Sequence, residues 1–425
     1  MVVAPASSDL AERIAAFVRR DFTPHFGERA DEFASHPLWA RLRDLGSELW
    51  LDTGNLDDAA EQWTREFRAL TTNNTLLNRE VHRGVYDDLI REAAHLLDAE
   101  ADLSDHDRML ELAFILNACH GLRLVESFDA YVSVEEHTDL AHDVAAAVET
   151  ARRYHAICPE RFIVKVPLTP AGLLATRRLS DEGVSVNHTL GFSARQNVMI
   201  ARLGRPAFVN VFLGRLGSFI KTNGLGGGAQ VGERATLASQ RAVKTLRDAG
   251  RTPSRQIAAS FREPAQVRDL AGVDVLTMPP KVARGFLDLG LRPDEVLDRT
   301  GESYRPGLAP GVDPGAVGLP TLWDVDERVG ACLDALDRED LEAFTPSDLV
   351  AFFADHGCGD LLVDWTDEQV AASAAEGKIP DLGNWRDGLA SGEVGLDALM
   401  TLAGLNAFVA DQQAMDAHVA EVVEA

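Results

Sequence analysis

The feature that most constrains the fold of this chain is a set of short apolar runs that recur from about residue 48 onward. Most of them are apolar along their whole length, as expected of parallel strands that are covered on both faces. Stretches with helical spacing lie between the runs, for example 171–183 and 232–250. The runs occupy residues 48–53, 69–75, 129–136, 161–167, 184–193, 207–215, 256–262 and 273–280.

Eight strands that alternate with helices predict an α/β fold, and we favour a (β/α)8 TIM barrel. A doubly wound open sheet is the structural alternative, because the alternation alone does not separate the two folds. Residues 76–128 are too long for one ordinary connection and predict extra helices. The barrel is therefore expected to span residues 48–300.

Three segments flank the predicted barrel. Residues 1–47 are expected to form an N-terminal helical segment, since residues 9–20 carry apolar side chains at helical spacing. Residues 301–395 are rich in Pro, Gly and Trp, and we expect an acidic, mainly helical inserted subdomain there. Helical spacing returns in residues 396–425, which are expected to form a C-terminal helix that packs on the barrel.

The charge of the chain limits its partners. The 425 residues carry a net charge of −26, from 41 basic and 67 acidic side chains. Residues 306–395 alone hold 19 acidic and four basic side chains, so this segment contributes −15. Such a chain is repelled by nucleic acids and acidic membranes, and we expect it to bind neither. A small anionic ligand needs only a local cluster of arginines and stays compatible with this charge.

The remaining composition predicts a cytoplasmic protein. No run of 18 or more apolar residues is present, and the first residues lack the pattern of a secretory signal. The four cysteines lie far apart without a CxxC pair, which fits a reducing compartment and argues against a zinc site or disulfide framework. The histidines form no metal-binding motif, so neither a metal nor another cofactor is expected.

A polar side chain occurs within or at the end of almost every predicted strand. In a barrel the carboxyl ends of the strands converge on one mouth, which is where the active sites of such folds lie. Seven strands with polar residues at this level predict a binding site. The residues are Asp52, Thr71, Asn73, Glu135, Lys165, Asn187, Thr189, Asn210, Arg215, Ser260 and Arg262.

Lys165 is the most informative of these residues, because the chain has only five lysines and this one interrupts an otherwise apolar strand. Partial desolvation is expected to lower its pKa, so that a fraction of the amine is neutral and can attack a carbonyl group. The resulting Schiff base permits cleavage of a neighbouring C–C bond. Such chemistry also needs general acid–base groups, and Asp52 and Glu135 are the available carboxylates.

The order of these motifs resembles the transaldolase family, a class of Schiff-base aldolase barrels. The matching stretches are LDTGN, TTNNTLLN, VSVE, IVKVP, VNHTLGFS, VFLGR and ASFR, with LNAFVADQQAMDAHV similar to the last helix of the family. The resemblance covers about 48–290 and 396–420. It implies transfer of a dihydroxyacetone unit from a ketose phosphate to an aldose phosphate, without a cofactor.

The resemblance also implies a role for each matching residue. Lys165 would be the Schiff-base lysine, Asp52 the acid–base group for C–C cleavage, and Glu135 and Thr189 the partners of a catalytic water. Asn73 and Asn187 would bind the dihydroxyacetone hydroxyls, whereas Arg215 and Arg262 would hold the sugar phosphate. Further substrate contacts are expected from Thr71, Asn210, Phe212 and Ser260. Phe212 stands where lyase-type relatives carry Tyr, which favours transfer over simple aldol cleavage.

The chain departs from the family pattern at a few positions. Asn210 stands where the family usually has Ser, Asn74 replaces the usual Pro, and the 301–395 segment is absent from short members. These departures leave room for a fructose-6-phosphate aldolase-like lyase or for a transaldolase with an unusual sugar acceptor. A barrel that binds sugar phosphates without turnover is the alternative from another class. We expect sugar phosphates as partners of a monomer or homodimer.

Several residues also have a purely structural interpretation. Lys165 could be a structural lysine paired with Glu135 or Asp52, and Glu136 competes with Glu135 for one role. Lys281 is a rival nucleophile, but its position predicts a loop or helix start. The GLGGGA stretch at 224–229 matches a dinucleotide-binding pattern, yet we favour a loop at the barrel mouth because no strand directly precedes it. His188 is interpreted as a histidine packed outside the barrel.

Overall fold

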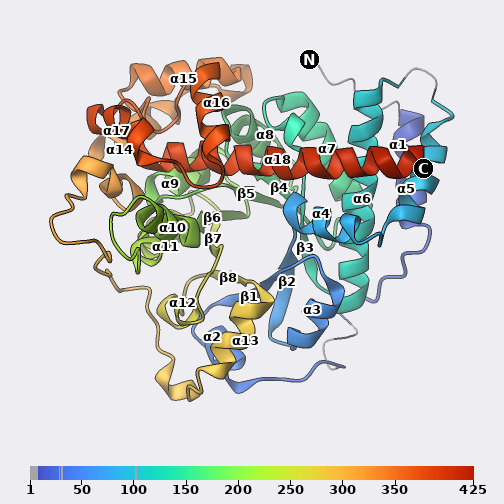
Figure 1. The fold of residues 1–425 in the computed structure, drawn as a ribbon, viewed down its shortest axis with the longest axis horizontal. Helices are drawn as coiled ribbons and strands as arrows, with labels where there is room; N and C mark the ends of the chain where they lie inside the picture. Colours follow the sequence, from blue (N-terminus) through green and yellow to red (C-terminus); the bar gives the residue numbers. More distant parts are fainter. Residues whose placement is uncertain (1–7, 28, 30–31, 101–102) are drawn as a thin grey trace.

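The computed structural model describes residues 8–27, 29, 32–100 and 103–425, which form a closed barrel of eight parallel strands (Figure 1). Neighbouring strands pair in chain order from β1 to β8, and β1 pairs with β8 to close the ring. The prediction of a (β/α)8 barrel is therefore confirmed, and the open sheet is excluded. The strands are β1 Glu48–Asp52, β2 Phe67–Thr71, β3 Tyr131–Glu135, β4 Phe162–Pro167, β5 Val186–Thr189, β6 Phe208–Phe212, β7 Arg255–Ala259 and β8 Val275–Met278.

The apolar runs form strands because a barrel strand is covered on both faces. All residues of β5, β6 and β8 are buried, and so are those of β4 before Pro167. The lower end of the barrel is filled by side chains, with the rings of Trp50 and Phe208 in edge contact at 4.9 Å. The barrel is thus a packed core below its mouth, as is general for this fold.

The predicted runs are longer than the observed strands, and two of them end two or more residues inside a helix. The 69–75 run starts two residues after β2 begins and ends in a helix, because Asn73 caps α4 by accepting a hydrogen bond from the Leu76 amide at 2.9 Å. The 207–215 run is wrong in its last three residues, since a helix begins at Leu213. Arg215 therefore lies in the first turn of α10 and not at a strand end.

Helices connect the strands around the outside of the barrel. Residues 76–128 contain extra helices, as predicted, and α6 is the longest of them. The connecting elements are α3 Leu56–Gln62, α4 Asn74–His82, α5 Asp87–Leu97, α6 Asp105–Phe128, η2 Thr138–Leu140, α7 Val144–Ile157, α8 Pro170–Asp181, α9 Ala194–Leu203, α10 Leu213–Thr222, α11 Val231–Asp248, α12 Ala265–Asp269 and α13 Pro280–Asp288.

The flanking segments are helical. Of the predicted 1–47 segment, residues 1–7, 28 and 30–31 lie outside the described residues; the rest contains α1 Ser8–Arg19 and α2 Pro37–Asp44. The long final helix, α18 Leu396–Glu424, crosses the β4–β5 side of the barrel (Figure 1, red). After α13, the elements before α18 are η3 Pro293–Glu295, η4 Gly315–Val317, η5 Leu319–Leu322, α14 Glu327–Leu336, η6 Leu341–Ala343, α15 Pro346–Asp355, α16 Asp367–Glu376 and α17 Leu382–Ser391.

A buried ion network joins the 301–395 segment to the barrel. Arg195 of α9 donates to both carboxylate oxygens of Asp397 in α18, at 2.8 and 2.7 Å, and to Asp360 at 2.6 Å. All three side chains are buried. Removing one partner of such a network leaves an uncompensated buried charge, so the network fixes the segment against α9 and α18.

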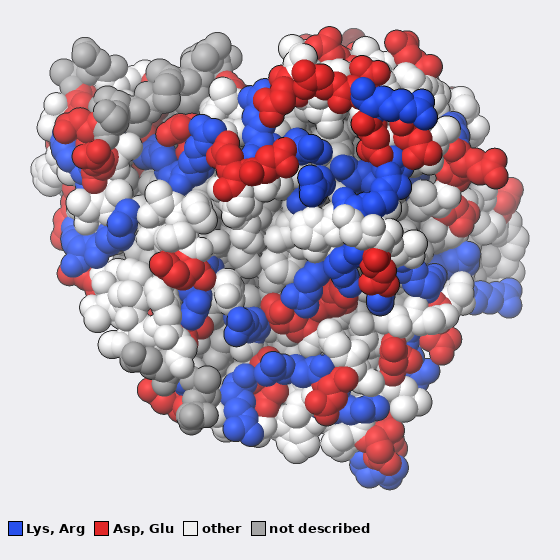
Figure 2. Space-filling model, turned by 180° about the vertical axis from the view of Figure 1, so that it is seen from behind, with Lys and Arg blue, Asp and Glu red and all other residues white. Residues whose placement is uncertain are grey.

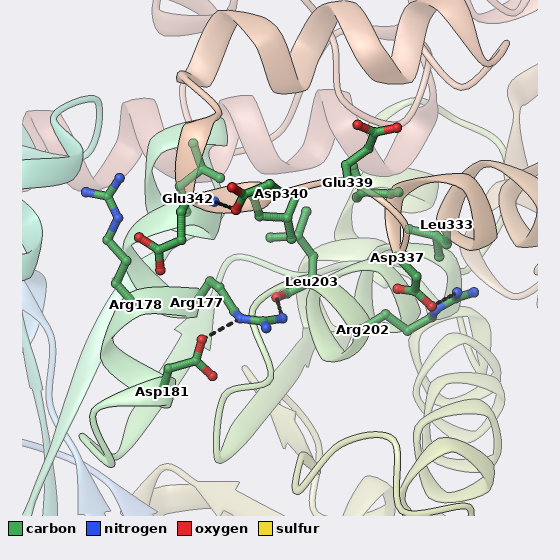
Figure 3. A pocket seen from close by; sticks show the side chains of 13 residues that line it. Arg177, Arg178, Asp181, Arg202, Leu203, Leu333, Asp337, Glu339, Asp340 and Glu342 are labelled. Atoms are coloured by element: carbon green, nitrogen blue, oxygen red, sulfur yellow. Dashed lines mark hydrogen bonds and ion pairs between the residues drawn. The ribbon is translucent and has the colours of Figure 1, made fainter.

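The outer surface carries both signs of charge. On the face opposite to that of Figure 1, acidic and basic side chains are interspersed (Figure 2). A cavity of about 220 Å³ lies between α8, α9 and the α14–η6 region (Figure 3). Two ion pairs lie in its lining, Arg177 with Asp181 at 2.7 Å and Arg202 with Asp337. Within the described part of the chain, no helix is both long and apolar enough to cross a membrane.

Candidate active site

A second cavity, of about 730 Å³, is larger than the one between α8 and α9 and opens at the carboxyl ends of the barrel strands. Among the described residues, seven basic side chains line it against two acidic ones, Asp52 and Asp58, so its wall is positive in a strongly acidic protein. Ten of the twelve predicted site residues lie on this wall. They are Asp52, Thr71, Asn73, Lys165, Asn187, Asn210, Phe212, Arg215, Ser260 and Arg262.

Lys165 lies on the cavity wall although the residue is only 4% exposed. Its Nζ is 3.3 Å from Oε1 of Glu135 and 3.4 Å from the carbonyl oxygen of Thr72. The ring of Phe408 in α18 lies 5.4 Å away and covers the amine from one side. The amine therefore has a carboxylate that can take its proton, and it also faces open space.

The strand register explains why Glu135 and not Glu136 reaches this amine. Glu135 of β3 lies directly opposite Lys165 of β4 in the parallel ladder. The other carboxylate oxygen of Glu135, Oε2, accepts a hydrogen bond from the backbone N–H of Asn74 at 2.9 Å. Successive side chains of a strand point to opposite faces, so Glu136 points outward. Burial, together with the charge of Glu135, raises the pKa of Glu136 well above its usual range.

Asp52 lies at the end of β1 and lines the cavity. Its carboxylate accepts a hydrogen bond from the Thr71 hydroxyl at 2.8 Å, and that hydroxyl also contacts Thr277 at 2.7 Å. Burial raises the pKa of Asp52, although the hydrogen bond from Thr71 and the charge of Lys165 oppose the rise. A carboxyl group with a raised pKa is suited both to accept and to return a proton near neutral pH.

A chain of amide groups lines the floor between β3 and β6. Asn187 donates to Ser133 at 3.1 Å and accepts from the Nδ2 of Asn210 at 3.2 Å. Asn210 also donates to the His188 carbonyl at 3.2 Å and accepts from the Gly191 amide at 3.3 Å. Because both polar atoms of Asn210 are engaged, its side chain orients Asn187 as well as lining the cavity.

Glu135 and Thr189 are the two predicted site residues that do not form part of the cavity wall. Thr189 ends β5 opposite Pro167 and is fully buried. Its hydroxyl has no hydrogen-bond partner among the described residues. Buried hydroxyl groups are usually satisfied, so this one marks a place where a bound polar group would be stabilised.

Two arginines form the cationic end of the cavity. Arg215 is buried, and its Nη1 has no acceptor among the described residues. Burial and the nearby charge of Arg262 lower the pKa of Arg215 to about 10, so the group is still charged at neutral pH. Arg262 is exposed beside it. A buried guanidinium with an unused donor strongly favours an anionic ligand.

Gly214 allows this arginine pair to form. A Cβ at this position would lie 2.1 Å from the carbonyl oxygen of Ser260 and 2.7 Å from Cγ of Arg262. The start of α10 can therefore approach the end of β7 only with glycine here. Ser260 itself adopts a left-handed φ of 66°, a strained conformation of the kind that clusters at functional sites.

Phe212 ends β6 beside the arginine pair. Its ring contacts Phe192 at 5.7 Å and Phe408 at 6.4 Å. The guanidinium of Arg215 lies 5.5 Å from the Phe212 ring and 5.6 Å from the Phe408 ring. The two aromatic rings thus flank the buried arginine.

The structure also adds residues that sequence reasoning missed. Phe408 lies in the predicted C-terminal helix, and its ring covers Lys165. Arg79 in α4 lines the cavity and acts electrostatically on Asp52. Lys378 and Ile379 reach the cavity from the 301–395 segment. No local pattern marks these two residues, because their position depends on how that whole segment packs.

The other predictions about individual residues agree with the structure. Lys281 is the second residue of α13 and is exposed at the cavity rim. His188 points away from the barrel interior and contacts the Thr176 hydroxyl at 2.8 Å. Burial lowers the pKa of His188 to about 3. The 224–229 stretch connects α10 with α11, so a helix and not a strand precedes it.

The raised pKa of Asp52 predicts a pH-dependent effect of Asp52→Asn on stability. Between the usual value of 3.8 and the raised value, the folded chain binds a proton at Asp52 more tightly than the unfolded chain does. Ionisation of Asp52 therefore destabilises the folded state as the pH rises through this window. Relative to the wild type, the free energy of unfolding of the variant in urea should increase as the pH rises above the usual pKa of 3.8 and through the raised pKa of Asp52.

Asp58→Asn is the matched control for this measurement, because Asp58 is an exposed carboxylate on the wall of the same cavity. It should follow the pH dependence of the wild type. Parallel curves for Asp52→Asn and the wild type would contradict the expected cost of burying the Asp52 charge.

Comparison with known proteins identifies the family. The family model described as transaldolase/fructose-6-phosphate aldolase matches residues 49–305, which include every strand from Leu49 onward. The transaldolase of Xanthomonas campestris pv. campestris is 32% identical over 253 residues, covering 58% of this chain and 77% of the relative. The probable transaldolase of Thermus thermophilus is 33% identical over 254 residues, covering 58% and 95%. The chain belongs to the transaldolase/fructose-6-phosphate aldolase family.

Proposed function

We propose that this enzyme transfers a dihydroxyacetone unit from a ketose phosphate to an aldose phosphate through a Schiff base on Lys165. Sedoheptulose 7-phosphate and fructose 6-phosphate are the proposed donors. The observation that carries the proposal is a nearly buried amine that borders a 730 Å³ cavity, with a carboxylate 3.3 Å from its nitrogen. Family membership supports the same reaction class.

The first half of the proposed reaction forms the covalent intermediate. The neutral Lys165 amine attacks C2 of the ketose, and the carbinolamine loses water to give an iminium ion. Glu135 lies close enough to take the ammonium proton before attack and to return one to the departing hydroxyl group. Thr189, whose buried hydroxyl lacks a partner in the described structure, would hold the water that is exchanged in this step.

The second half breaks and remakes a C–C bond. Asp52 accepts the proton of the C4 hydroxyl group while the C3–C4 bond breaks, and the bond electrons move to the iminium nitrogen to form an enamine. The shortened aldose phosphate leaves. The enamine then attacks the aldehyde carbon of the acceptor, Asp52 returns its proton, and water releases the new ketose. The raised pKa of Asp52 suits this two-way proton transfer.

The polar residues of the cavity wall would orient the bound substrate. We assign Asn73 and Asn187 to the dihydroxyacetone hydroxyls and the arginine pair Arg215 and Arg262 to the phosphate. Thr71, Asn210, Phe212 and Ser260 would contact the carbon chain. The unused donor of buried Arg215 supports the phosphate assignment, because arginine and phosphate form strong, charge-assisted hydrogen bonds. This reaction would need no cofactor or metal from the protein.

A fructose-6-phosphate aldolase-like lyase is the second candidate, since the family includes such enzymes by name. It uses the same lysine but releases dihydroxyacetone to water. The apolar ring of Phe212, packed against Phe192 and Phe408, favours transfer because it places no hydroxyl group beside the intermediate. A transaldolase that uses an unusual sugar acceptor in a specialised pathway is the third candidate, because Asn210 stands where the family usually has Ser.

Chemical trapping tests the proposed nucleophile. Borohydride added with fructose 6-phosphate should attach a reduced three-carbon unit to the peptide that carries Lys165, detected by mass spectrometry. Lys165→Arg keeps the positive charge but should form no adduct. Its activity should fall about a thousandfold or more. Lys281→Arg is the matched control on the same cavity wall and should retain both.

An unmodified Lys165 peptide, in a protein that still binds fructose 6-phosphate, would support a barrel that binds sugar phosphates without turnover. An adduct on Lys281 instead would replace the nucleophile while keeping the reaction class.

A coupled assay separates transfer from cleavage. With fructose 6-phosphate alone, glyceraldehyde 3-phosphate should appear in an amount comparable to the enzyme and then stop, because the enamine on Lys165 waits for an acceptor. Addition of erythrose 4-phosphate should restore continuous release. Equally fast, continuous release without an acceptor would favour the lyase.

A further inference from the structure

We propose that Lys378, supplied by the 301–395 segment, is a third cation of the phosphate site and raises the preference of the enzyme for phosphorylated sugars. This inference rests on the proposed function, because it concerns the anionic end of the same substrate. Lys378 and Ile379 line the cavity that also exposes Lys165, Arg215 and Arg262. They lie outside residues 49–305, the part of the chain that matches the family.

The turn that carries Lys378 is held firmly at the mouth of the barrel. It connects α16 with α17, and both of its flanks are tied to elements of the cavity. Asn223, at the end of α10, accepts from the Leu382 amide at 2.8 Å and donates to the Pro380 carbonyl at 3.0 Å. Asn406 of α18 donates to the Val370 carbonyl in α16 at 3.2 Å. The insertion therefore places this lysine by specific contacts.

The carboxylate that pairs with Lys378 also acts electrostatically on the buried arginine of the pair. The Nζ of Lys378 lies 3.4 Å from Oδ2 of Asp411 in α18, and the same oxygen accepts a hydrogen bond from the Thr75 hydroxyl. Asp411 also acts electrostatically on Arg215. Lys378 thus pairs with a carboxylate whose charge also acts on Arg215, and both basic residues line the same cavity.

The exposed ion pair leaves Lys378 able to change partners. Its side chain is 56% exposed, and exposed ion pairs contribute little to stability. Lysine carries a compact charge on a flexible stem, so its ammonium can leave Asp411 for a doubly charged phosphate group nearby. Arg215 and Arg262 supply the directional hydrogen bonds, and Lys378 adds a movable charge. This division predicts an effect on phosphate binding but none on the chemistry at Lys165.

The test compares Lys378→Ala with Lys244→Ala, the latter a lysine of α11 that is 54% exposed and pairs with Asp248 at 2.6 Å. Affinity for inorganic phosphate is measured by calorimetry, and KM is measured for fructose 6-phosphate and for fructose. Lys378→Ala should weaken phosphate binding and raise the KM for fructose 6-phosphate about five- to tenfold, with the KM for fructose unchanged. Lys378→Arg should restore most of the difference, and Lys244→Ala should behave as the wild type.

Wild-type phosphate affinity in Lys378→Ala would overturn the inference, and so would an equal rise of KM for both sugars. Failure of the proposed function is distinguishable from either result. In that case wild-type protein would give no borohydride adduct at Lys165, whereas calorimetry would still report whether Lys378 contributes to phosphate binding.

Discussion

The ion pair between Lys165 and Glu135 is the interaction on which the account of this enzyme depends. Two opposite charges are removed from water at the base of the barrel mouth, which is costly unless they compensate each other. Their positions follow from the parallel register of β3 and β4, which sets the two residues directly opposite. A structural ion pair of this kind would be packed on all sides. Here one side of the amine faces a cavity large enough for a sugar phosphate.

The remainder of the fold arranges charge around that amine. The β1 strand brings Asp52 to the cavity wall, and burial raises its pKa so that it can exchange protons. Gly214 lets α10 approach β7, which sets buried Arg215 beside Arg262. Helix α18 then covers the assembly with Phe408. An acidic protein thereby acquires a locally positive cavity, whose charge comes from a few positioned side chains and not from overall composition.

Much of this arrangement could be predicted from the sequence. Recurring apolar runs separated by helical stretches indicated the barrel, and polar residues at the strand ends indicated the site, because parallel strands bring those ends together. The prediction of strand boundaries was least accurate where a helix begins directly after a strand. Asn73 is the N-cap of α4, and Arg215 lies within α10. The two predicted strands that contain these residues are therefore longer than the observed strands. Alternation alone could not choose between Glu135 and Glu136, since that choice requires the register against β4.

The contributions of distant segments could not be predicted. Lys378 follows the last strand by about a hundred residues, and Phe408 follows it by more than a hundred. Both reach the cavity only through tertiary packing. For Lys378 that packing depends on the buried network of Arg195, Asp360 and Asp397, whose members are far apart in the chain. Such long-range pairings leave no periodic pattern, so the insertion was recognised by its composition while its part in the cavity was not.

The most direct measurement of the central claim is a crystal structure of the protein after borohydride reduction in the presence of dihydroxyacetone. We expect continuous electron density from Nζ of Lys165 to C2 of the ligand, with Glu135 within hydrogen-bonding distance of the new secondary amine. Density for an unattached ligand in the cavity, with the Lys165 nitrogen still paired only with Glu135, would contradict the account.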